Sequence, residues 1–251
     1  MKGESDVPQT SNFQYSLSLK ETLGLKWSPV AVKLVKPDET INEIPPKSPK
    51  RLRYCQLLME GKRGKSATLT NENIACPAAA AALGLMPLPE KISSGKMLKT
   101  LGLFESENAA AKTMAQMPKM KLGEVKAIAA APLENATFRP DVVIIEDKPE
   151  KIMWINLAAI HETGGRLSFS SAVFQACCVD VTVIPYQTKN VNVSLGCYGC
   201  RDATDIEDDE CLVGIPIEKM DKITTSLKAL AQKAMPEARN KGVYNQFVKA
   251  Q

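Results

Sequence analysis

Five of the chain's seven cysteines lie within residues 177–211, and this stretch restricts the fold more than any other part of the sequence. Two of them form a Cys-x-x-Cys pair, Cys197 and Cys200, in a glycine-containing turn. The apolar runs 179–185 and 191–195 precede the pair, and their Val, Thr, Ile and Leu content predicts two strands. The pair is therefore expected just after a strand end, where glycines let the backbone approach whatever the sulfurs hold.

The other two cysteines lie earlier, next to or within predicted helices. Apolar residues recur at helical spacing in segment 50–61, which places Cys55 on the buried face. Pro77 suits an early helical position because its missing N–H would have no partner there. Cys76 is then expected at or just before a helix N-terminus, where free N–H groups favour the thiolate that a metal needs.

The cysteine pattern favours an iron–sulfur cluster, most simply a 4Fe–4S cluster. Ligands drawn from distant chain segments are typical of a cluster inside a folded domain, whereas a structural zinc site wants two close pairs. His161 is the single histidine, so His-rich zinc and di-iron sites are excluded. Cys177 and Cys211 are predicted to be small buried core residues, because free cysteine is often buried.

Two other functions remain open from the residues alone. The first is a metal-free protein that binds a small ligand among its strand ends, with the cysteines in the core. The second is a thiol redox enzyme that uses Cys197 and Cys200, for which the first thiol would have to be exposed at a helix N-terminus.

Short strand-like runs alternate with helical segments along the chain, which predicts an α/β fold with a mixed sheet and helices on its faces. With 251 residues, 44% of them hydrophobic, the chain can form one large core. We expect a disordered tail over residues 1–13, a single domain over 14–251, and a proline-rich loop over 37–49.

The charge and hydropathy patterns exclude several classes of protein. A net charge of +4 is too small to indicate nucleic acid, and there is no run of about 18 apolar residues for a membrane span. The polar N-terminus lacks the apolar core of a signal peptide, so a cytoplasmic location is expected, where thiols stay reduced. A homodimer is the default expectation for a chain of this kind.

Basic residues gather between positions 47 and 65, and they predict a docking surface for an acidic electron carrier or a site for a small anionic ligand. The alternative is a solvated helix face. Arg201 directly follows the cysteine turn, where its guanidinium would stabilise thiolates or bind an anionic substrate.

Four segments together resemble one known family, and the similarity extends from about residue 19 to residue 230. They read RYCQLL at 53–58, NENIACPAAAAALGL at 71–85, CVDVTVIPY at 178–186 and SLGCYGCRDATDIEDDECLVGIP at 194–216. In order and spacing they are similar to the domain-of-unknown-function 169 family, which is prokaryotic and common in anaerobes and archaea. The resemblance implies an α/β fold and no agreed activity.

The resemblance also implies a ligand set. The family's cysteines match Cys55, Cys76, Cys178 and Cys197, and its conserved glycine and arginine match Gly199 and Arg201. The position of Cys200 is often not cysteine in the family. The implied cluster site is therefore Cys55, Cys76 and Cys197 with either Cys178 or Cys200, and Gly199 and Arg201 are expected beside the bound cofactor.

Overall fold

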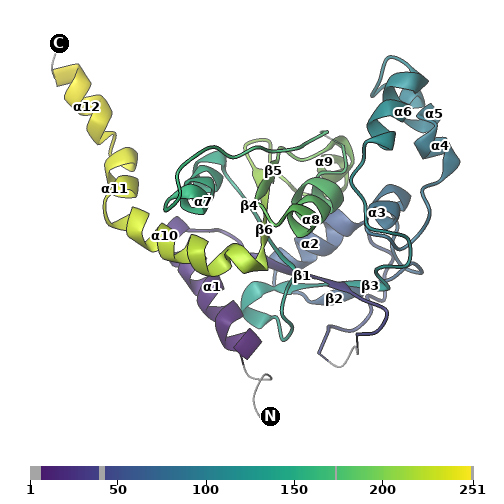
Figure 1. Ribbon diagram of the computed structural model, residues 1–251, viewed down its shortest axis with the longest axis horizontal. Coiled ribbons are helices and arrows are strands. Elements are labelled where there is room, and N and C mark those ends of the chain that lie inside the picture. Colours follow the sequence, from purple (N-terminus) through teal and green to yellow (C-terminus); the bar gives the residue numbers. More distant parts are fainter. Residues whose placement is uncertain (1–6, 40–42, 173, 250–251) are drawn as a thin grey trace.

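A single six-stranded sheet forms the centre of the computed structural model, which describes residues 7–39, 43–172 and 174–249 (Figure 1). The strand order is β2-β3-β1-β4-β6-β5, and every strand pairing in these residues is antiparallel. The strands are β1 (Val30–Val35), β2 (Ala67–Leu69), β3 (Ala127–Pro132), β4 (Val142–Asp147), β5 (Asn192–Ser194) and β6 (Cys211–Pro216).

Side chains of each central strand alternate between two separate cores, one on each face of the sheet. Val30, Val32 and Leu34 of β1 enter the first core, and Ala31 and Val35 enter the second. Both faces are covered, so these strands read as nearly continuous apolar runs. The predicted α/β class with helices on the faces of a sheet is confirmed, and the sheet itself is antiparallel rather than mixed.

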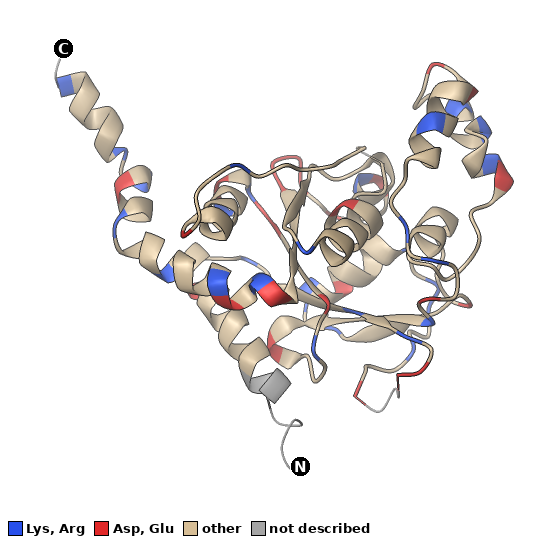
Figure 2. Cartoon of the chain, in the orientation of Figure 1, with Lys and Arg blue, Asp and Glu red and all other residues tan. Residues whose placement is uncertain are grey.

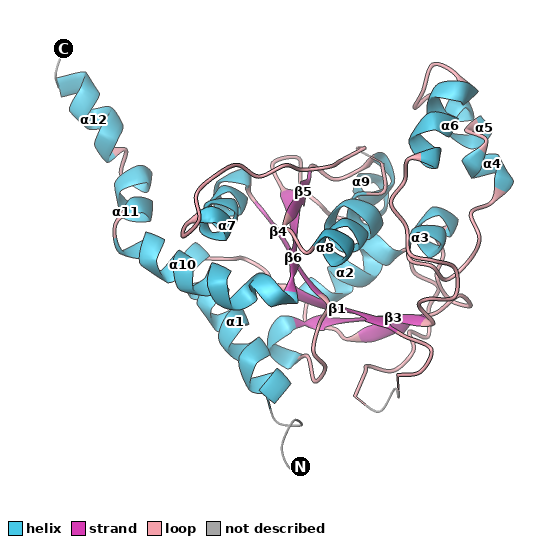
Figure 3. Ribbon diagram, in the orientation of Figure 1, coloured by secondary structure: helices cyan, strands magenta, loops and turns pink. Residues whose placement is uncertain are grey.

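The second core lies under three long helices, which we call the helical face (Figure 3). Helix α10 repeats its apolar residues at helical spacing, and Met220, Ile223 and Leu227 of this helix are fully buried. The helical face consists of α1 (Val7–Leu23), α7 (Pro149–Ile160) and α10 (Met220–Gln232), with the 3₁₀ turns η1 (Leu133–Asn135) and η3 (Ile217–Lys219) nearby.

The first core is covered by short helices, and we call this side the thiol face because six cysteines belong to it. Its helices are α2 (Tyr54–Lys62), α3 (Pro77–Ala82), α4 (Glu90–Ser93), α5 (Lys96–Thr100), α6 (Glu107–Ala115), the π-helix η2 (Ala176–Val183), α8 (Ile184–Thr188) and α9 (Tyr198–Ala203). Helices α4, α5 and α6 form a group at one end of the molecule (Figure 1). Beyond α10, helices α11 (Ala234–Arg239) and α12 (Gly242–Lys249) lead away from the body.

The run 179–185 is not a strand, as its β-branched residues had predicted, but lies in the π-helix η2 and the start of α8. This run packs on the face of the sheet beside β6 and is not one of its six strands. Gly214 permits the close packing, because a Cβ there would lie 2.2 Å from the Val181 carbonyl oxygen. Tertiary packing has overridden strand propensity.

The predicted disordered tail over 1–13 is also partly wrong, because helix α1 begins at Val7. Asn12 is buried, and its Nδ2 donates to the carbonyl oxygens of Ala136 and Phe138 at 3.0 and 2.9 Å, which fixes this end of α1. Residues 1–6 lie outside the described part of the chain. The predicted strand 191–195 is confirmed as β5, and no helix or strand lies in the described part of the proline-rich loop 37–49.

Candidate functional site

Six cysteines from four chain segments line one cavity of about 70 Å³ on the thiol face. Cys76, which caps α3, is partly exposed, whereas the other five thiols are buried. No disulfide is present, and all six cysteines are free thiols. Cys55 comes from α2, Cys177 and Cys178 come from η2, and Cys197 and Cys200 come from the start of α9, with Cys76 as the sixth.

Three of these thiols form a continuous row. The Cys197 and Cys200 sulfurs are 3.1 Å apart, and the Cys200 and Cys177 sulfurs are 3.4 Å apart. Cys197 is the N-cap of α9 and accepts a hydrogen bond from the Cys200 N–H at 3.4 Å. The prediction that Cys177 is a core residue is correct for its burial but misses its place in the thiol row.

Helix α2 fixes the cysteine turn through two side chains. Arg53 Nη1 donates to the Gly199 carbonyl oxygen at 3.1 Å, and Gln56 Nε2 donates to the Ala203 carbonyl oxygen at 3.3 Å. Both acceptors belong to α9, which carries Cys200. Cys55 and the Cys-x-x-Cys pair are therefore held together although they are far apart in the sequence.

A second set of contacts joins α2 to the π-helix. The hydroxyls of Tyr54 and Thr182 are 2.8 Å apart, and the Thr182 hydroxyl donates to the Cys177 carbonyl oxygen at 2.7 Å. Burial raises the pKa of Tyr54 well above its ordinary value, so this phenol stays a neutral hydrogen-bonding group. The paired hydroxyls therefore hold η2 in register beside Cys55.

Three thiols of the cavity, Cys177, Cys178 and Cys197, resist ionisation. The hydrogen bond to Cys200, followed by burial, raises the pKa of both Cys177 and Cys197, and burial followed by repulsion from Cys76 raises the pKa of Cys178. Negative charges brought this close in an apolar cavity repel one another. The donor set therefore fits a cationic cofactor, since coordination of a thiol by a metal deprotonates it outright.

Cys211 is excluded from this group by the sheet. It lies in β6 with its side chain in the core of the helical face. Burial raises its pKa to about 11, with Arg201 opposing the shift. The prediction that Cys211 is a core residue is confirmed.

Two comparisons identify the family of the chain. The family model named DUF169, Uncharacterised ArCR, matches residues 18–226. The chain belongs to the DUF169 family. It is also similar to Uncharacterized protein MJ0308 of Methanocaldococcus jannaschii, with 31% identity over 216 residues that cover 85% of this chain and 92% of the relative. No solved structure matches it.

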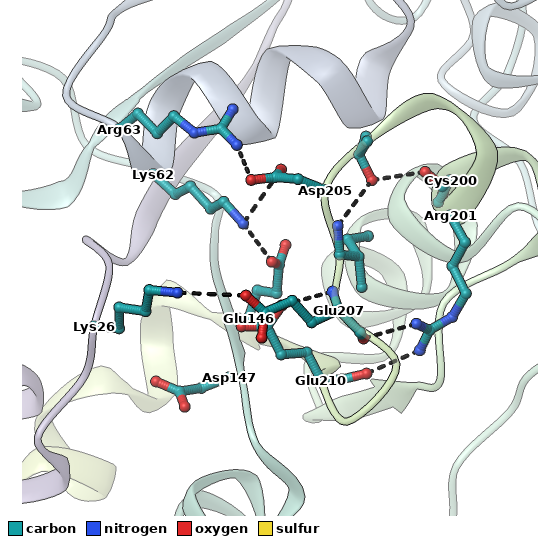
Figure 4. Close-up of polar contacts among 12 residues, drawn as sticks. Lys26, Lys62, Arg63, Glu146, Asp147, Cys200, Arg201, Asp205, Glu207 and Glu210 are labelled. Carbon is teal, nitrogen blue, oxygen red and sulfur yellow. Dashed lines mark hydrogen bonds and ion pairs between the residues drawn. The ribbon is translucent and has the colours of Figure 1, made fainter.

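In this DUF169 protein, the two residues expected beside a cofactor lie in different surroundings. Gly199 lines the cavity, but Arg201 does not. The guanidinium of Arg201 donates to the carbonyl oxygens of Glu207 and Glu210 at 2.8 and 2.9 Å (Figure 4). It also donates to the Leu195 carbonyl oxygen at 2.6 and 3.2 Å, and so fastens residues 207–210 to the cysteine turn. The cation at the cavity is Arg53 instead, one of the basic residues between positions 47 and 65 that predict a docking surface or an anion site.

The basic residues between 47 and 65 are largely engaged within the chain itself. Lys62 is buried against Glu146, and Arg63 pairs with Asp205 (Figure 4). In Figure 2, cationic and anionic segments alternate along the chain and do not gather on one element. Ion pairs of this kind also involve Lys47 with Glu72, Arg53 with Asp202 and Lys65 with Glu60. The surface predicted for an acidic carrier therefore carries less free charge than the sequence indicates.

The described residues contain neither a group that could hold a single metal ion nor a helix that could span a membrane. Across 7–39, 43–172 and 174–249, no three His, Cys, Asp or Glu side chains are arranged to hold a single metal ion. The same residues include no helix that is both long and apolar enough to span a bilayer.

Proposed function

We propose that the protein binds an iron–sulfur cluster, of the 4Fe–4S type, in the six-thiol cavity. The supporting observation is the convergence of six free thiols, drawn from four segments, on one cavity. Thiolate sulfur is the usual protein ligand of such clusters. The proposed ligands are Cys55, Cys76 and Cys197, with Cys178 or Cys200 as the fourth, and the structure adds Cys177 as a further candidate.

The proposed role is electron transfer, redox sensing or the binding of a small ligand at the cluster, which supplies one-electron chemistry when bound. Arg53 lines the cavity, and in each of these roles its guanidinium would offset the negative charge of a thiolate-ligated cluster. Gly199 leaves open space at the cavity, since a Cβ there would meet nothing within 4 Å. The cysteines are free thiols, and thiols stay reduced in the cytosol. We therefore propose a cytoplasmic location.

The first experiment is purification under strict anaerobiosis, with iron, acid-labile sulfide and the visible spectrum measured together. We expect about four iron and four sulfide per chain for the proposed cluster type. Cys197→Ala should lose most of both, whereas Cys211→Ala should retain them because its side chain lies on the opposite face of the sheet. A colourless, iron-free protein of equal stability would contradict the proposal.

A thiol redox function is the second candidate, and the 3.1 Å separation of the Cys197 and Cys200 sulfurs favours it. Against it, Cys197 is only 6% exposed and its pKa is raised, whereas an attacking thiol needs access and thiolate character. Alkylation of these two thiols should abolish an exchange activity if this candidate is right. The metal-free ligand-binding alternative predicts instead that Cys76→Ser folds and functions normally.

A further inference from the structure

A second, larger cavity adjoins the thiol cavity, with a volume of about 300 Å³. This is the lower end of the range of small-molecule sites. It lies between α6, residues 170–172 and the π-helix η2, and Phe174 and Gln175 line both cavities. The two cavities are therefore neighbours with Phe174 and Gln175 in common.

Gln175 is the feature that points to a ligand. Its side chain is only 8% exposed, and its amide nitrogen has no hydrogen-bond partner among the described residues. Leaving such a donor unpaired costs about 1–3 kcal/mol, so an unpaired buried amide calls for an explanation. An acceptor atom on a molecule bound in the cavity would remove this cost.

The backbone of Gln175 is held in an uncommon conformation. Its φ of 70° lies in the left-handed region, where residues other than glycine, asparagine and aspartate are rarely found. Its carbonyl oxygen accepts from the Val179 N–H at 2.9 Å and from the Asp180 N–H at 3.4 Å, and the second bond has the five-residue spacing of a π-helix. Such strained residues and π-helical turns cluster at functional sites, where the surrounding structure holds them in place.

The chemistry of the walls restricts the ligand. Asp180 is 1% exposed and presents a carboxylate that is oriented by the Ser194 and Ser171 hydroxyls at 2.7 and 2.8 Å. Neither Lys nor Arg occurs among the described residues that line this cavity. Phosphates and carboxylates would therefore meet a negative wall without a cation to balance it. Phe174, Met117 and Val179 add an apolar surface for a ring or a short aliphatic chain.

We propose that this cavity binds an uncharged polar ring compound whose carbonyl oxygen accepts from the Gln175 amide and whose N–H faces the Asp180 carboxylate. The proposal goes beyond the cluster and does not require it, since Gln175 and Asp180 are not thiol ligands. The proposal also assigns uncharged and anionic ligands to different cavities. The small anionic ligand expected from the sequence would find a cation at the thiol cavity, where Arg53 lies, and none among the described residues that line the larger cavity.

The test uses ligand-observed NMR on the full chain, with iron and sulfide measured in the same samples. The probes are uracil and 2-pyridone, which carry adjacent C=O and N–H groups, and benzoate as an anion of similar size. We expect both lactams to bind and benzoate not to bind.

Gln175→Leu should weaken lactam binding about tenfold, the equivalent of one buried hydrogen bond. Gln187→Leu is the matched control, because Gln187 is exposed and its amide donates to the Lys119 carbonyl oxygen outside the cavity.

A second variant guards against misfolding of Gln175→Leu. Asparagine tolerates the left-handed backbone, so Gln175→Asn should fold and retain an amide that is one methylene too short, again with weaker lactam binding. Binding of neither lactam at millimolar concentration, equal binding by the Gln175 variants, or tighter binding of benzoate would each overturn the proposal. If the samples contain neither iron nor sulfide and still bind the lactams, the proposed cluster function is refuted while the proposal for this cavity holds.

Discussion

The two faces of the sheet are built from different kinds of helix, and they hold their cysteines differently. The helical face is covered by three helices of 12–17 residues whose apolar positions repeat regularly, and its cysteine, Cys211, is an isolated core residue. The thiol face is covered by helices of 4–9 residues, one of them a π-helix, and it gathers six cysteines. A long helix buries a continuous apolar face against the sheet. Several short helices instead place the side chains at their N-termini, which come from distant segments, around one point.

From this contrast we infer that the two faces have different roles. The helical face supplies stability through burial, and the thiol face carries unfavourable features such as buried thiols that resist ionisation, a glutamine with a left-handed backbone and a buried ion pair. Strained and unpaired groups persist only where the surrounding structure holds them. Three sets of variants test this difference, beginning with the largest expected effect.

Lys62→Met should destabilise the thiol face most. Lys62 and Glu146 are 3% and 4% exposed at their side chains, and removing one member of a buried pair costs about 3–5 kcal/mol. Lys189→Met is the control, because the pair of Lys189 with Glu218 is largely exposed and should cost under about 1 kcal/mol. Urea denaturation of both variants at several pH values measures the difference.

The pH dependence of Lys62→Met has a definite sign. Burial raises the pKa of Glu146 from 4.5 to about 7, with Lys62 opposing the shift. Between these values the folded state binds more protons than the unfolded state, so this group's contribution to stability falls as pH rises. Without Lys62 the pKa of Glu146 rises further, and the loss continues above pH 7. The variant should therefore lose more stability at pH 8 than at pH 5, and an equal loss would contradict the assignment.

A pair of core substitutions can separate stability from metal content. Leu227→Ala on the helical face should cost about 2–5 kcal/mol, because this leucine is fully buried, yet leave iron per folded chain unchanged. Ala79→Leu on the thiol face fills the cavity, should change stability by about 1–3 kcal/mol and should abolish iron binding. Equal iron losses in the two variants would show that the faces are not independent.

Gly196→Ala should have the smallest of these effects, about 1–2 kcal/mol. Gly196 has a φ of 84°, and a Cβ there would lie 3.0 Å from Arg201 Nε. Gly102→Ala is the control, since Gly102 has a similar φ of 73° but open space around it. Thermal unfolding should show a larger loss for Gly196→Ala, and the extra loss measures the contact with Arg201. Identical losses would mean that backbone strain alone acts at both sites.

Several elements of the thiol face follow from local sequence rules. Pro77 predicts the start of α3 and the capping position of Cys76. The inward position of Cys55 follows from helical spacing in α2. These predictions hold because the interactions that decide them lie within a few residues of one another.

What the sequence determined by itself was the α/β class, the helices that carry Cys55 and follow Cys76, the strand at 191–195 and the family, because periodicity and motif order are properties of the chain alone. The tertiary structure decided the rest. It made a β-branched run a π-helix that packs on the sheet face against Gly214, and it brought Cys177 into the thiol row while leaving Cys211 on the other face. It also put Arg53 rather than Arg201 at the cavity. These outcomes depend on contacts between residues distant in the chain, which no local pattern records.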